Sequence, residues 1–511
     1  MSSVFRLLAR FFGARSTVSR PTRERMRRWC GEVQRLCAQG SLAAAQKALD
    51  RCPLIEAPQQ ALQAIEQAVV PILRLCERQR DAETALATER WAYNLVKLYE
   101  RASHYDACLR AMDAPLHALG MQAAAGRAQA SRASRQRVLF YVHSLGAEMA
   151  HMQLLAELIE AHVQSEPQSA SDIGIIGREG PQGRCASIRR MASLGVSIRE
   201  VGLREPLAAM FEAADDEMNR QRFGQLIFVS IPVGLSYACA RLGPDRVGWL
   251  SMKFEIGAIE ALRWRYSFSC GLRQEREAGG KAWLAAAPLM NRPPPLETST
   301  GGPPRAVASA RRLGTVLYTV NREEKIRDPA YLDAVCDVLQ RCSGTAFVWT
   351  GHNALPAITN VFERRGLADR QFFAGWVSPD DLLGACDIFL DTPHLSGTVA
   401  ARAMLLGKPV VTWAGSQAWI NFFAEAIERD ATRSTYPEIA QGLRSLRGRG
   451  ITLACADVKA FGAQAARLVN DPALRSEYGA LLQRIAERYF LDSARAARDH
   501  FANFKGLPLP P

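Results

Sequence analysis

The sequence predicts an α/β fold with two doubly wound parallel sheets, preceded by an all-α N-terminal domain. From about residue 136, short apolar segments alternate with helical segments, and the alternation restarts after a stretch rich in Pro and Gly. Strands that alternate with helices in this way are typical of parallel sheets with crossover helices. Before residue 132, apolar residues recur only at the three- and four-residue spacing of helices.

Size and composition indicate a globular protein of several domains. The chain has 511 residues, of which 48% are hydrophobic and 23% charged. No apolar run reaches the roughly 18 residues that a membrane-spanning helix needs. Arg6 and Arg10 interrupt the apolar N-terminal stretch, so no secretory signal is expected. The twelve cysteines form no C-x-x-C pair or Cys/His cluster, which favours reduced thiols, no metal site and a cytoplasmic location.

The N-terminal segment, residues 1–24, is strongly basic. The first 28 residues hold eight arginines and one acid, Glu24, in a chain of net charge +13. The segment VFRLLARFF puts its apolar residues near one helical face and its arginines on another. Residues 1–28 are therefore either an amphipathic contact with an anionic membrane, at its inner face, or a basic disordered tail. No zinc-finger, RNP or basic-zipper pattern occurs, so nucleic acid is not an expected partner.

Residues 25–132 are expected to form helices only. The segments LAAAQKALD, ALQAIEQAVVPILRLCERQ and ERWAYNLVKLYERASHYDACLRAMDAPL carry the helical spacing. The stretch from Trp91 to Leu116 resembles one tetratricopeptide-type helical pair, but one unit is not an array, and a plain bundle is the alternative. We expect this domain to bind rather than to catalyse.

Two α/β domains follow, with a linker between them. The expected strands of residues 136–290 are RVLFYVHS, DIGIIG, SIREVG, QLIFVSI and RVGWLS. Residues 291–312 are rich in Pro, Gly and Ser, and we expect a linker in which nothing up to Ala310 forms a packed helix. The expected strands of residues 313–490 are TVLYTV, TAFVWTG, QFFAGW, DIFLDT and KPVVTW, and residues 491–511 form a C-terminal helix and tail.

Two loops at strand ends suit a phosphate. In open parallel sheets, ligands bind at the carboxyl ends of the strands. After DIFLDT, Gly397 permits close backbone approach, and Thr398 begins the helix AARAMLLG, whose free N–H groups favour an anion. An ordinary turn capped by Ser396 or Thr398 is the alternative.

The second loop, NREEKI, follows TVLYTV. It places Asn321, Arg322 and Lys325 at another strand end of the same sheet. Both kinds of cation suit phosphate oxygens, although Glu323 and Glu324 would also fit a solvated turn of mixed charge. Because both loops belong to one edge, we expect a ligand between the two α/β domains.

A family resemblance is carried by NREEKI, FVWTGH, RQFFAGWVSPDDLLGACDIFLDTP, SGTVAARAMLLGKPVVTW and LVNDPALRSEYGALL. Through these motifs, residues from about 315 to 490 resemble the C-terminal half of a GT-B glycosyltransferase, most closely the O-linked N-acetylglucosamine transferase group. Less specifically, HSLGAEMAH resembles the glycine loop of the acceptor-side domain. The resemblance implies two Rossmann-like domains of GT-B type, an acceptor-side domain at 136–290 and a donor domain at 313–490.

The resemblance also implies roles for individual residues. Arg322 and Lys325, with Asn321 beside them, would hold the donor diphosphate. Trp376 and Val377 would border the nucleotide base. The remaining donor-binding residues would be the cradle at the start of the helix and the pair that ends FVWTGH, namely Ser396, Gly397, Thr398, Val399, Gly351 and His352.

Arg402 departs from the family pattern. Many retaining relatives carry a glutamate there, which holds the donor ribose, and its Glu-x7-Glu partner falls at His394 in this sequence. A guanidinium accepts no hydrogen bond, so ribose recognition differs or the site is weakened, and the retaining class is disfavoured. Arg402 is expected to face the donor site and to meet a diphosphate oxygen, a carboxylate of an acidic sugar or an acid of the protein.

A catalytic base is expected in the loop HSLGAEMAH. Inverting transfer needs a group that takes the proton of the acceptor hydroxyl. His143, at the strand end, is the first candidate, with Glu148 and His151 as the others or as plain surface residues of the helix. No Asp-x-Asp occurs in a suitable loop, so the leaving diphosphate is expected to be neutralised without metal.

The resulting hypothesis is a metal-independent, inverting hexosyl- or N-acetylhexosaminyl-transferase. Its donor would be a nucleotide sugar, with a UDP-sugar favoured, its acceptor a protein or glycan, and it would need no further cofactor. Arg402 suggests an alternative, a degenerate transferase that binds or scaffolds through its helical domain. Another two-domain sugar-nucleotide enzyme, such as an epimerase, is disfavoured because the resemblance follows transferase-type strand ends.

Overall fold

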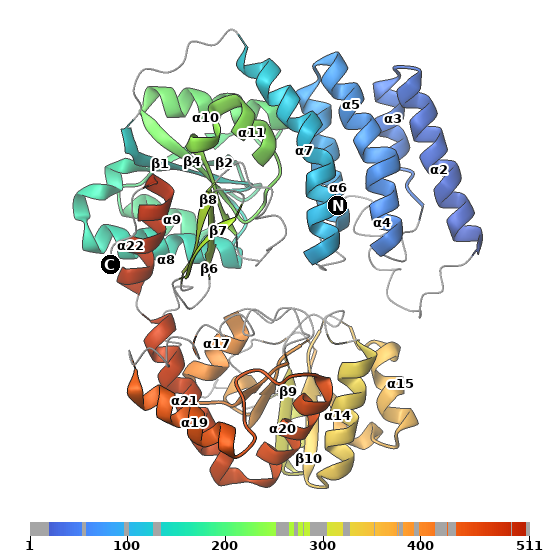
Figure 1. The fold of residues 1–511 in the computed structure, drawn as a ribbon, viewed down its shortest axis with the longest axis vertical. Coiled ribbons are helices and arrows are strands. Elements are labelled where there is room, and N and C mark those ends of the chain that lie inside the picture. Colours follow the sequence, from blue (N-terminus) through green and yellow to red (C-terminus); the bar gives the residue numbers. More distant parts are fainter. Residues whose placement is uncertain are drawn as a thin grey trace.

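The chain forms a helical region and two α/β domains (Figure 1). The predicted fold class, two doubly wound sheets after an all-α region, is confirmed. The computed structural model describes residues 20–53, 58–96, 102–125, 134–251, 265–269, 274–278, 281–286, 304–319, 326, 328–351, 353–375, 377, 382–392, 398–413, 427, 436–491 and 493–506.

The helical region buries the apolar stripes that its sequence predicts. Ile72, Leu73 and Cys76, for example, lie in its core. The first helix begins at Arg20, within the expected segment 1–24, and residues 1–19 lie outside the described part. The helices are α2 (Arg20–Ala38), α3 (Leu42–Leu49), α4 (Pro58–Ala64), the π-helix η1 (Ile65–Val69), α5 (Val70–Gln79), α6 (Ala82–Val96) and α7 (Ala102–Ala124).

The first α/β domain has an eight-stranded sheet in the order β3-β2-β1-β4-β5-β6-β8-β7, parallel except for β7. The five predicted strands are β1 (Ser134–Val142), β2 (Ile173–Arg178), β3 (Ser197–Val201), β4 (Phe223–Val229) and β5 (Val247–Ser251). The other three strands were not predicted from the sequence; RYSFS and QEREA lack an apolar run, whereas KAWLAA has one. These are β6 (Arg265–Ser269), β7 (Gln274–Ala278) and β8 (Lys281–Ala286). Between the strands lie α8 (Ala150–Ser165), η3 (Pro167–Asp172), α9 (Ala186–Ser193), α10 (Leu207–Arg220), α11 (Leu235–Leu242) and η4 (Pro244–Arg246).

The second domain has a fully parallel sheet in the order β11-β10-β9-β12-β13. Its strands occur where the sequence predicts them, as β9 (Thr315–Thr319), β10 (Thr345–Trp349), β11 (Gln371–Phe373), β12 (Ile388–Leu390) and β13 (Val410–Val411). The helices are α14 (Pro329–Arg341), α15 (Pro356–Arg364), η6 (Ala368–Arg370), α17 (Thr398–Leu405), α19 (Pro437–Gly448), α20 (Val458–Asn470) and α21 (Pro472–Phe490).

One helix lies where a linker was expected. Helix α13 (Arg305–Arg311) occupies part of residues 291–312 and buries Val307 and Ala310. The expectation that this stretch could not form a packed helix was therefore wrong. Pro304 fixes the backbone just before the helix, and the alanines of RAVASAR favour helical conformation. With Val307 and Ala310 three residues apart, this short helix has an apolar side to pack.

The chain returns to the first domain at its end. Helix α22 (Ser493–Lys505) packs on α8 and β1, as the position of the red helix in Figure 1 shows. The rings of Phe501 and Phe504 lie edge-on to Phe140 of β1, at centroid distances of 6.0 and 5.5 Å. The core of the first domain is therefore completed by residues that follow the second domain in sequence.

Carboxyl groups fasten the helical region to the first domain. Glu83 accepts a hydrogen bond from the N–H of Ala208 (2.7 Å), and Glu89 accepts one from the N–H of Gly234 (2.8 Å). These N–H groups belong to the starts of α10 and α11, where a helix attracts negative charge. Gly234 has a φ of 84° and touches Phe211, so a side chain there would clash. Burial raises the pKa of Glu89 to about 8 despite its hydrogen bond.

Within the described residues, no helix is long and apolar enough to cross a bilayer.

Candidate functional site

The carboxyl edge of the first sheet holds His143 and Arg178 next to each other. Val142 of β1 pairs with Gly177 of β2, so the next residues of these parallel strands, His143 and Arg178, follow at the same level. The loop after β1 is tied to β2, because the N–H of Leu145 donates to the carbonyl of Arg178 (2.8 Å).

Glycines let this loop and the loop after β2 approach closely. A Cβ on Gly146 would lie 2.5 Å from the Cα of Gly180. The glycine of the HSLGAEMAH motif therefore has a packing function, whatever ligand the loop meets.

His143 is neutral at ordinary pH. Burial lowers the pKa of its imidazole to about 4, and the charges of Arg90, Arg178 and His151 lower it further. A neutral imidazole can accept a proton, but a pKa so far below neutral makes it a weak base in this state.

Glu148 is engaged with a neighbouring helix. It accepts hydrogen bonds from the N–H (3.0 Å) and the hydroxyl of Ser187, in the first turn of α9. The residue at the N-cap position of that helix, Cys185, supplies no side-chain bond, so Glu148 caps α9 from outside. Burial raises the pKa of Glu148, but the bonds from Ser187 outweigh it, so the pKa lies below its ordinary value.

His151 is the second residue of α8 and is buried. It is close enough to lower the pKa of His143. The three candidate bases thus share one edge of the sheet, and their catalytic roles stay predictions. The bonds of Glu148 favour capping for that residue.

The donor-side candidates belong to the second domain. Gly351 follows β10, and its N–H donates to the carbonyl of Gly375 (3.3 Å). Val377 follows β11, while Thr398 and Val399 begin α17 after β12, as the sequence predicts. The other donor-side candidates lie outside the described residues: Asn321, Arg322, Lys325, His352, Trp376, His394, Ser396 and Gly397.

Arg402 acts on an acid of the other domain. Burial raises the pKa of Glu157, in α8, to about 7, and the positive charges of Arg190 and Arg402 counteract that rise. Arg190 also pairs with Glu160 of α8. Helix α17 lies on the side of the second domain that faces the first (Figure 1). Glu157 is thus a candidate for the expected acid of the protein, and the diphosphate and acidic-sugar partners of Arg402 stay predictions.

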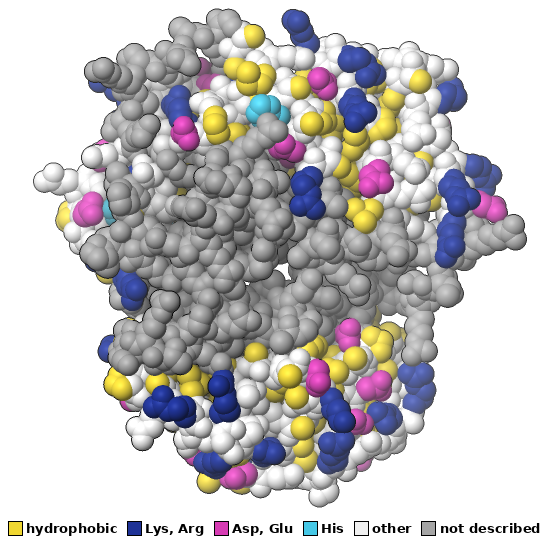
Figure 2. All heavy atoms as spheres, viewed as in Figure 1, with side chains coloured by type: hydrophobic (Ala, Val, Ile, Leu, Met, Phe, Trp, Pro, Cys, Tyr) yellow, Lys and Arg dark blue, Asp and Glu magenta, His cyan; other side chains and the backbone are white. Residues whose placement is uncertain are grey.

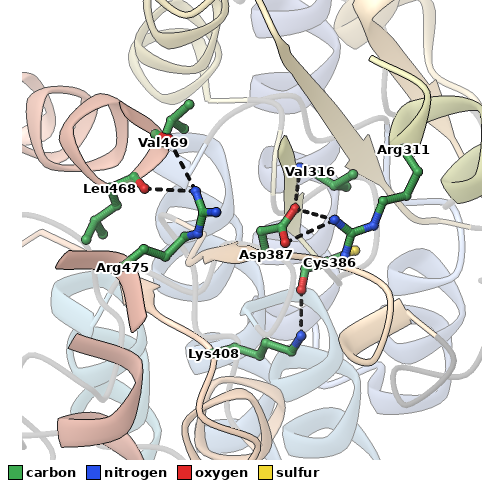
Figure 3. A network of polar contacts seen from close by, with 8 residues as sticks. All are labelled: Arg311, Val316, Cys386, Asp387, Lys408, Leu468, Val469 and Arg475. Atoms are coloured by element: carbon green, nitrogen blue, oxygen red, sulfur yellow. Dashed lines mark hydrogen bonds and ion pairs between the residues drawn. The ribbon is translucent and has the colours of Figure 1, made fainter. Parts of the chain in front are cut away.

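Other charged residues of the resemblance motifs lie at the opposite ends of the strands (Figure 3). Asp387, just before β12, pairs with Arg311 (2.8 Å) and accepts a hydrogen bond from the N–H of Val316 (2.8 Å). Lys408 donates to the carbonyl of Cys386 (2.8 Å). These bonds join the amino ends of β9, β12 and β13. Ligands of open parallel sheets bind at the opposite, carboxyl edge, so these bonds stabilise the sheet.

The Asp at the carboxyl end of DIFLDT is buried. The carboxylate of Asp391 accepts a hydrogen bond from the N–H of Thr392 (2.9 Å). Its charge acts on Tyr331 of α14, whose pKa burial raises. The Asp thus holds the backbone N–H of the residue that follows it at the end of β12.

Sequence reasoning missed three charged residues at these edges. Arg178 had a usable signal, because a cation that ends a buried strand was the reason for selecting Arg322. Arg90 and Glu157 had none, since each lies within a helix and meets its partners only through tertiary packing. Among described residues, no group of three or more His, Cys, Asp or Glu could hold a metal ion.

No protein-family model matches the chain, and no curated protein matches it. Solved structures do. An O-GlcNAc transferase mutant of Thermobaculum terrenum is similar over 96% of this chain and 99% of its own, with 15% identity and a TM-score of 0.49. HepE of Anabaena in complex with UDP-glucose has 12% identity, covers 70% of this chain and 96% of its own, and has a TM-score of 0.44. A glycosyltransferase of Rickettsia africae has 8% identity, covers 72% and 98%, and has a TM-score of 0.46.

At such identities and TM-scores, these solved structures carry no argument about substrate or residue roles. The fold class stands on the two sheets of the chain itself.

Proposed function

We propose that the protein is a glycosyltransferase that transfers a sugar from a nucleotide-diphosphate sugar to a protein or glycan hydroxyl. The observation that carries the proposal is the pair of parallel sheets, whose carboxyl edges hold the candidate residues, and the charge of Arg402 in one domain lowers the pKa of Glu157 in the other. Arg402 lies in the helix after β12, and Glu157 lies in the helix after β1, so these two helices, one in each domain, come within electrostatic range of each other. A ligand held at both sheet edges would lie between a donor domain and an acceptor domain.

The proposed reaction is a single displacement with inversion. The acceptor oxygen forms a bond to the anomeric carbon while the bond from that carbon to the diphosphate oxygen breaks. The diphosphate leaves with the electron pair, and His143 takes the acceptor proton. The N–H groups at the start of α17, with Arg322 and Lys325, would stabilise the charge on the leaving group without metal. We propose a UDP-sugar donor, because the motifs resemble the O-linked N-acetylglucosamine transferase group.

Binding of nucleotide diphosphates tests the donor site. UDP is expected to raise the melting temperature of the full chain, since a ligand at 100 times its Kd adds about 2.7 kcal/mol. Gly397→Val should abolish the shift, because a branched side chain would fill the space of the phosphate. Gly448→Val is the matched control, since an added Cβ there meets nothing within 4 Å. No shift with UDP, GDP or ADP would overturn the proposal.

Turnover separates the enzyme from the alternative, a degenerate transferase that binds through its helical domain. Arg402, in place of the expected carboxylate, is the observation that favours this alternative. Release of UDP from radiolabelled UDP-sugars, faster in wild type than in His143→Gln, is the expected result. UDP binding without any release from UDP-hexoses or UDP-N-acetylhexosamines would favour the degenerate form.

A further inference from the structure

Four basic side chains gather at the carboxyl edge of the first sheet. His143 and Arg178 end adjacent strands, His151 begins α8, and Arg90 comes from α6 of the helical region. Their proximity is seen in their mutual effects, since Arg90, Arg178 and His151 all lower the pKa of His143. We call these four residues the basic cluster.

Arg178 has bonding capacity left. Its guanidinium donates to the backbone carbonyl of Glu205, but its Nε is buried without a hydrogen-bond partner among the described residues. A buried donor without a partner is costly, so such an atom points to a ligand or solvent molecule.

Arg90 is held beside Arg178 by the docking of the helical region. The adjacent Glu89 bonds to Gly234, which fixes α6 on the first domain. Burial lowers the pKa of Arg90, and the charge of Arg178 lowers it further. Glu89 does not neutralise Arg90 at neutral pH, because burial raises the pKa of that carboxyl to about 8. Two guanidinium groups are therefore close enough to repel each other, and among the described residues no carboxylate shifts the pKa of Arg90 or His143.

A bound anion would offset this repulsion. Like charges in a partly buried site destabilise each other, and an oxyanion accepts the planar fork of arginine. We propose that the basic cluster binds an anionic group of the acceptor, a phosphate or a carboxylate, so that the helical region contributes Arg90 directly to the acceptor site. This inference rests on the proposed function.

The acceptor is the better assignment because the donor diphosphate has its own expected place, at the start of α17 in the second domain. An anion beside His143 would also change that residue. Negative charge favours the imidazolium form, so a bound acceptor would raise the pKa of His143 from about 4 toward neutral. The base would then become stronger only when the acceptor is present.

Calorimetric titration with inorganic phosphate tests the cluster in the full chain, with and without saturating UDP. Phosphate is expected to bind the UDP-saturated wild type, because UDP fills the donor site and leaves the basic cluster open. Arg90→Gln and Arg178→Gln should each weaken this binding at least tenfold, and Arg90→Lys should weaken it less. Arg199→Gln, at an exposed arginine of β3, is the matched control and should bind phosphate as wild type does. Melting temperatures confirm that each variant is folded.

Three results would overturn the inference. The first is that phosphate does not bind the UDP-saturated wild type. The second is that both cluster variants bind phosphate as wild type does. The third is that Arg90→Gln loses as much affinity for UDP as for phosphate. The last would assign the cluster to the donor diphosphate and leave the proposed function standing. If UDP fails to bind the wild type while phosphate binding still depends on Arg90 and Arg178, the proposed function fails and the anion site remains.

Discussion

Single residues at the two sheet edges differ in what they do, although the sequence presents them alike. Arg402 stands one turn into α17 and acts on Glu157 of the other domain. Asp387 and Lys408 belong to the same stretch of sequence, yet they bond at the amino ends of the strands. In the sequence, a charged residue next to a strand looks the same at either end of that strand. In an open parallel sheet, ligands bind only at the carboxyl ends.

Arg402→Glu is expected to impair use of the donor, because it replaces a cation near Glu157 with an acid and so reverses the charge at this point of α17. A coupling of about 0.5–3 kcal/mol is usual for side chains in one charged network, so donor affinity should fall by roughly tenfold. The double variant Arg402→Glu with Glu157→Arg should recover part of the loss, since the pair is restored with reversed charges. Calorimetry with UDP on the single and double variants measures both effects. Tighter binding by Arg402→Glu would contradict the assignment and favour a degenerate site.

Asp387→Ala is expected to destabilise the second domain without changing UDP affinity. The substitution removes hydrogen bonds from the N–H of Val316 and from Arg311, and a bond to a charged group contributes about 1.5–3 kcal/mol. Arg311→Gln should cost less than about 1 kcal/mol, because that side chain is 43% exposed. Urea unfolding and UDP titration of the two variants check this order. A large loss of UDP affinity in folded Asp387→Ala would place Asp387 at the ligand site instead.

At the scale of elements, helix starts decide how the helical region is joined to the first domain. Helices α6 and α7 present acids to the first turns of α10 and α11, where backbone N–H groups lack partners within their own helix. The same docking brings Arg90 to the sheet edge. The helical region is therefore bonded to the first domain and is not a separate module.

Docking of the helical region is expected to depend on pH through Glu89. The pKa of its carboxyl is raised to about 8 in the folded protein from an ordinary value of 4.5. Between pH 4.5 and about 8, the folded state therefore binds more protons than the unfolded state. Stability should therefore fall as pH rises from about 4.5 to about 8. Glu89→Gln keeps an oxygen for the N–H of Gly234 and should flatten this dependence. Urea unfolding across that range measures it, with the exposed Glu212→Gln as the control; equal slopes in Glu89→Gln and wild type would refute the role.

At the scale of the whole molecule, the excess positive charge is spread out. On the face in Figure 2, described Lys and Arg side chains occur over both the upper and the lower part, with Asp and Glu among them. Helix α2 adds exposed arginines, Arg23, Arg25, Arg27 and Arg28, directly after the basic N-terminal segment. If the protein binds an anionic membrane, residues 1–28 are the segment whose positive charge is concentrated enough to be attracted to the lipid headgroups.

Deleting residues 1–19 is expected to weaken binding to vesicles that contain anionic phospholipid, while UDP affinity stays unchanged. The deletion removes three arginines but leaves α2 whole. Co-sedimentation at low ionic strength measures the difference, which should shrink as salt is added. Neutral vesicles are the control. Equal sedimentation of the two proteins with anionic vesicles would remove the segment from any membrane role.

The sequence alone determined the strands and helices whose signal is local. Apolar runs such as QLIFVSI and TAFVWTG, and the helix that starts at Thr398, lie where periodicity predicts them, because burial of a continuous apolar stretch needs no knowledge of its partners. Local composition did not predict elements whose formation depends on the residues that they pack against. The stretch before Thr315 contains a helix because Val307 and Ala310 find a core to pack against.

Only the tertiary structure decided which distant residues meet. Helix α22 completes the first domain through Phe501 and Phe504, although it follows the second domain in sequence. Arg90 meets Arg178, and Arg402 acts on Glu157, across separations that no spacing rule covers. Charge and burial act through space and not along the chain, so the effect of a buried arginine depends on the side chains that folding brings to it.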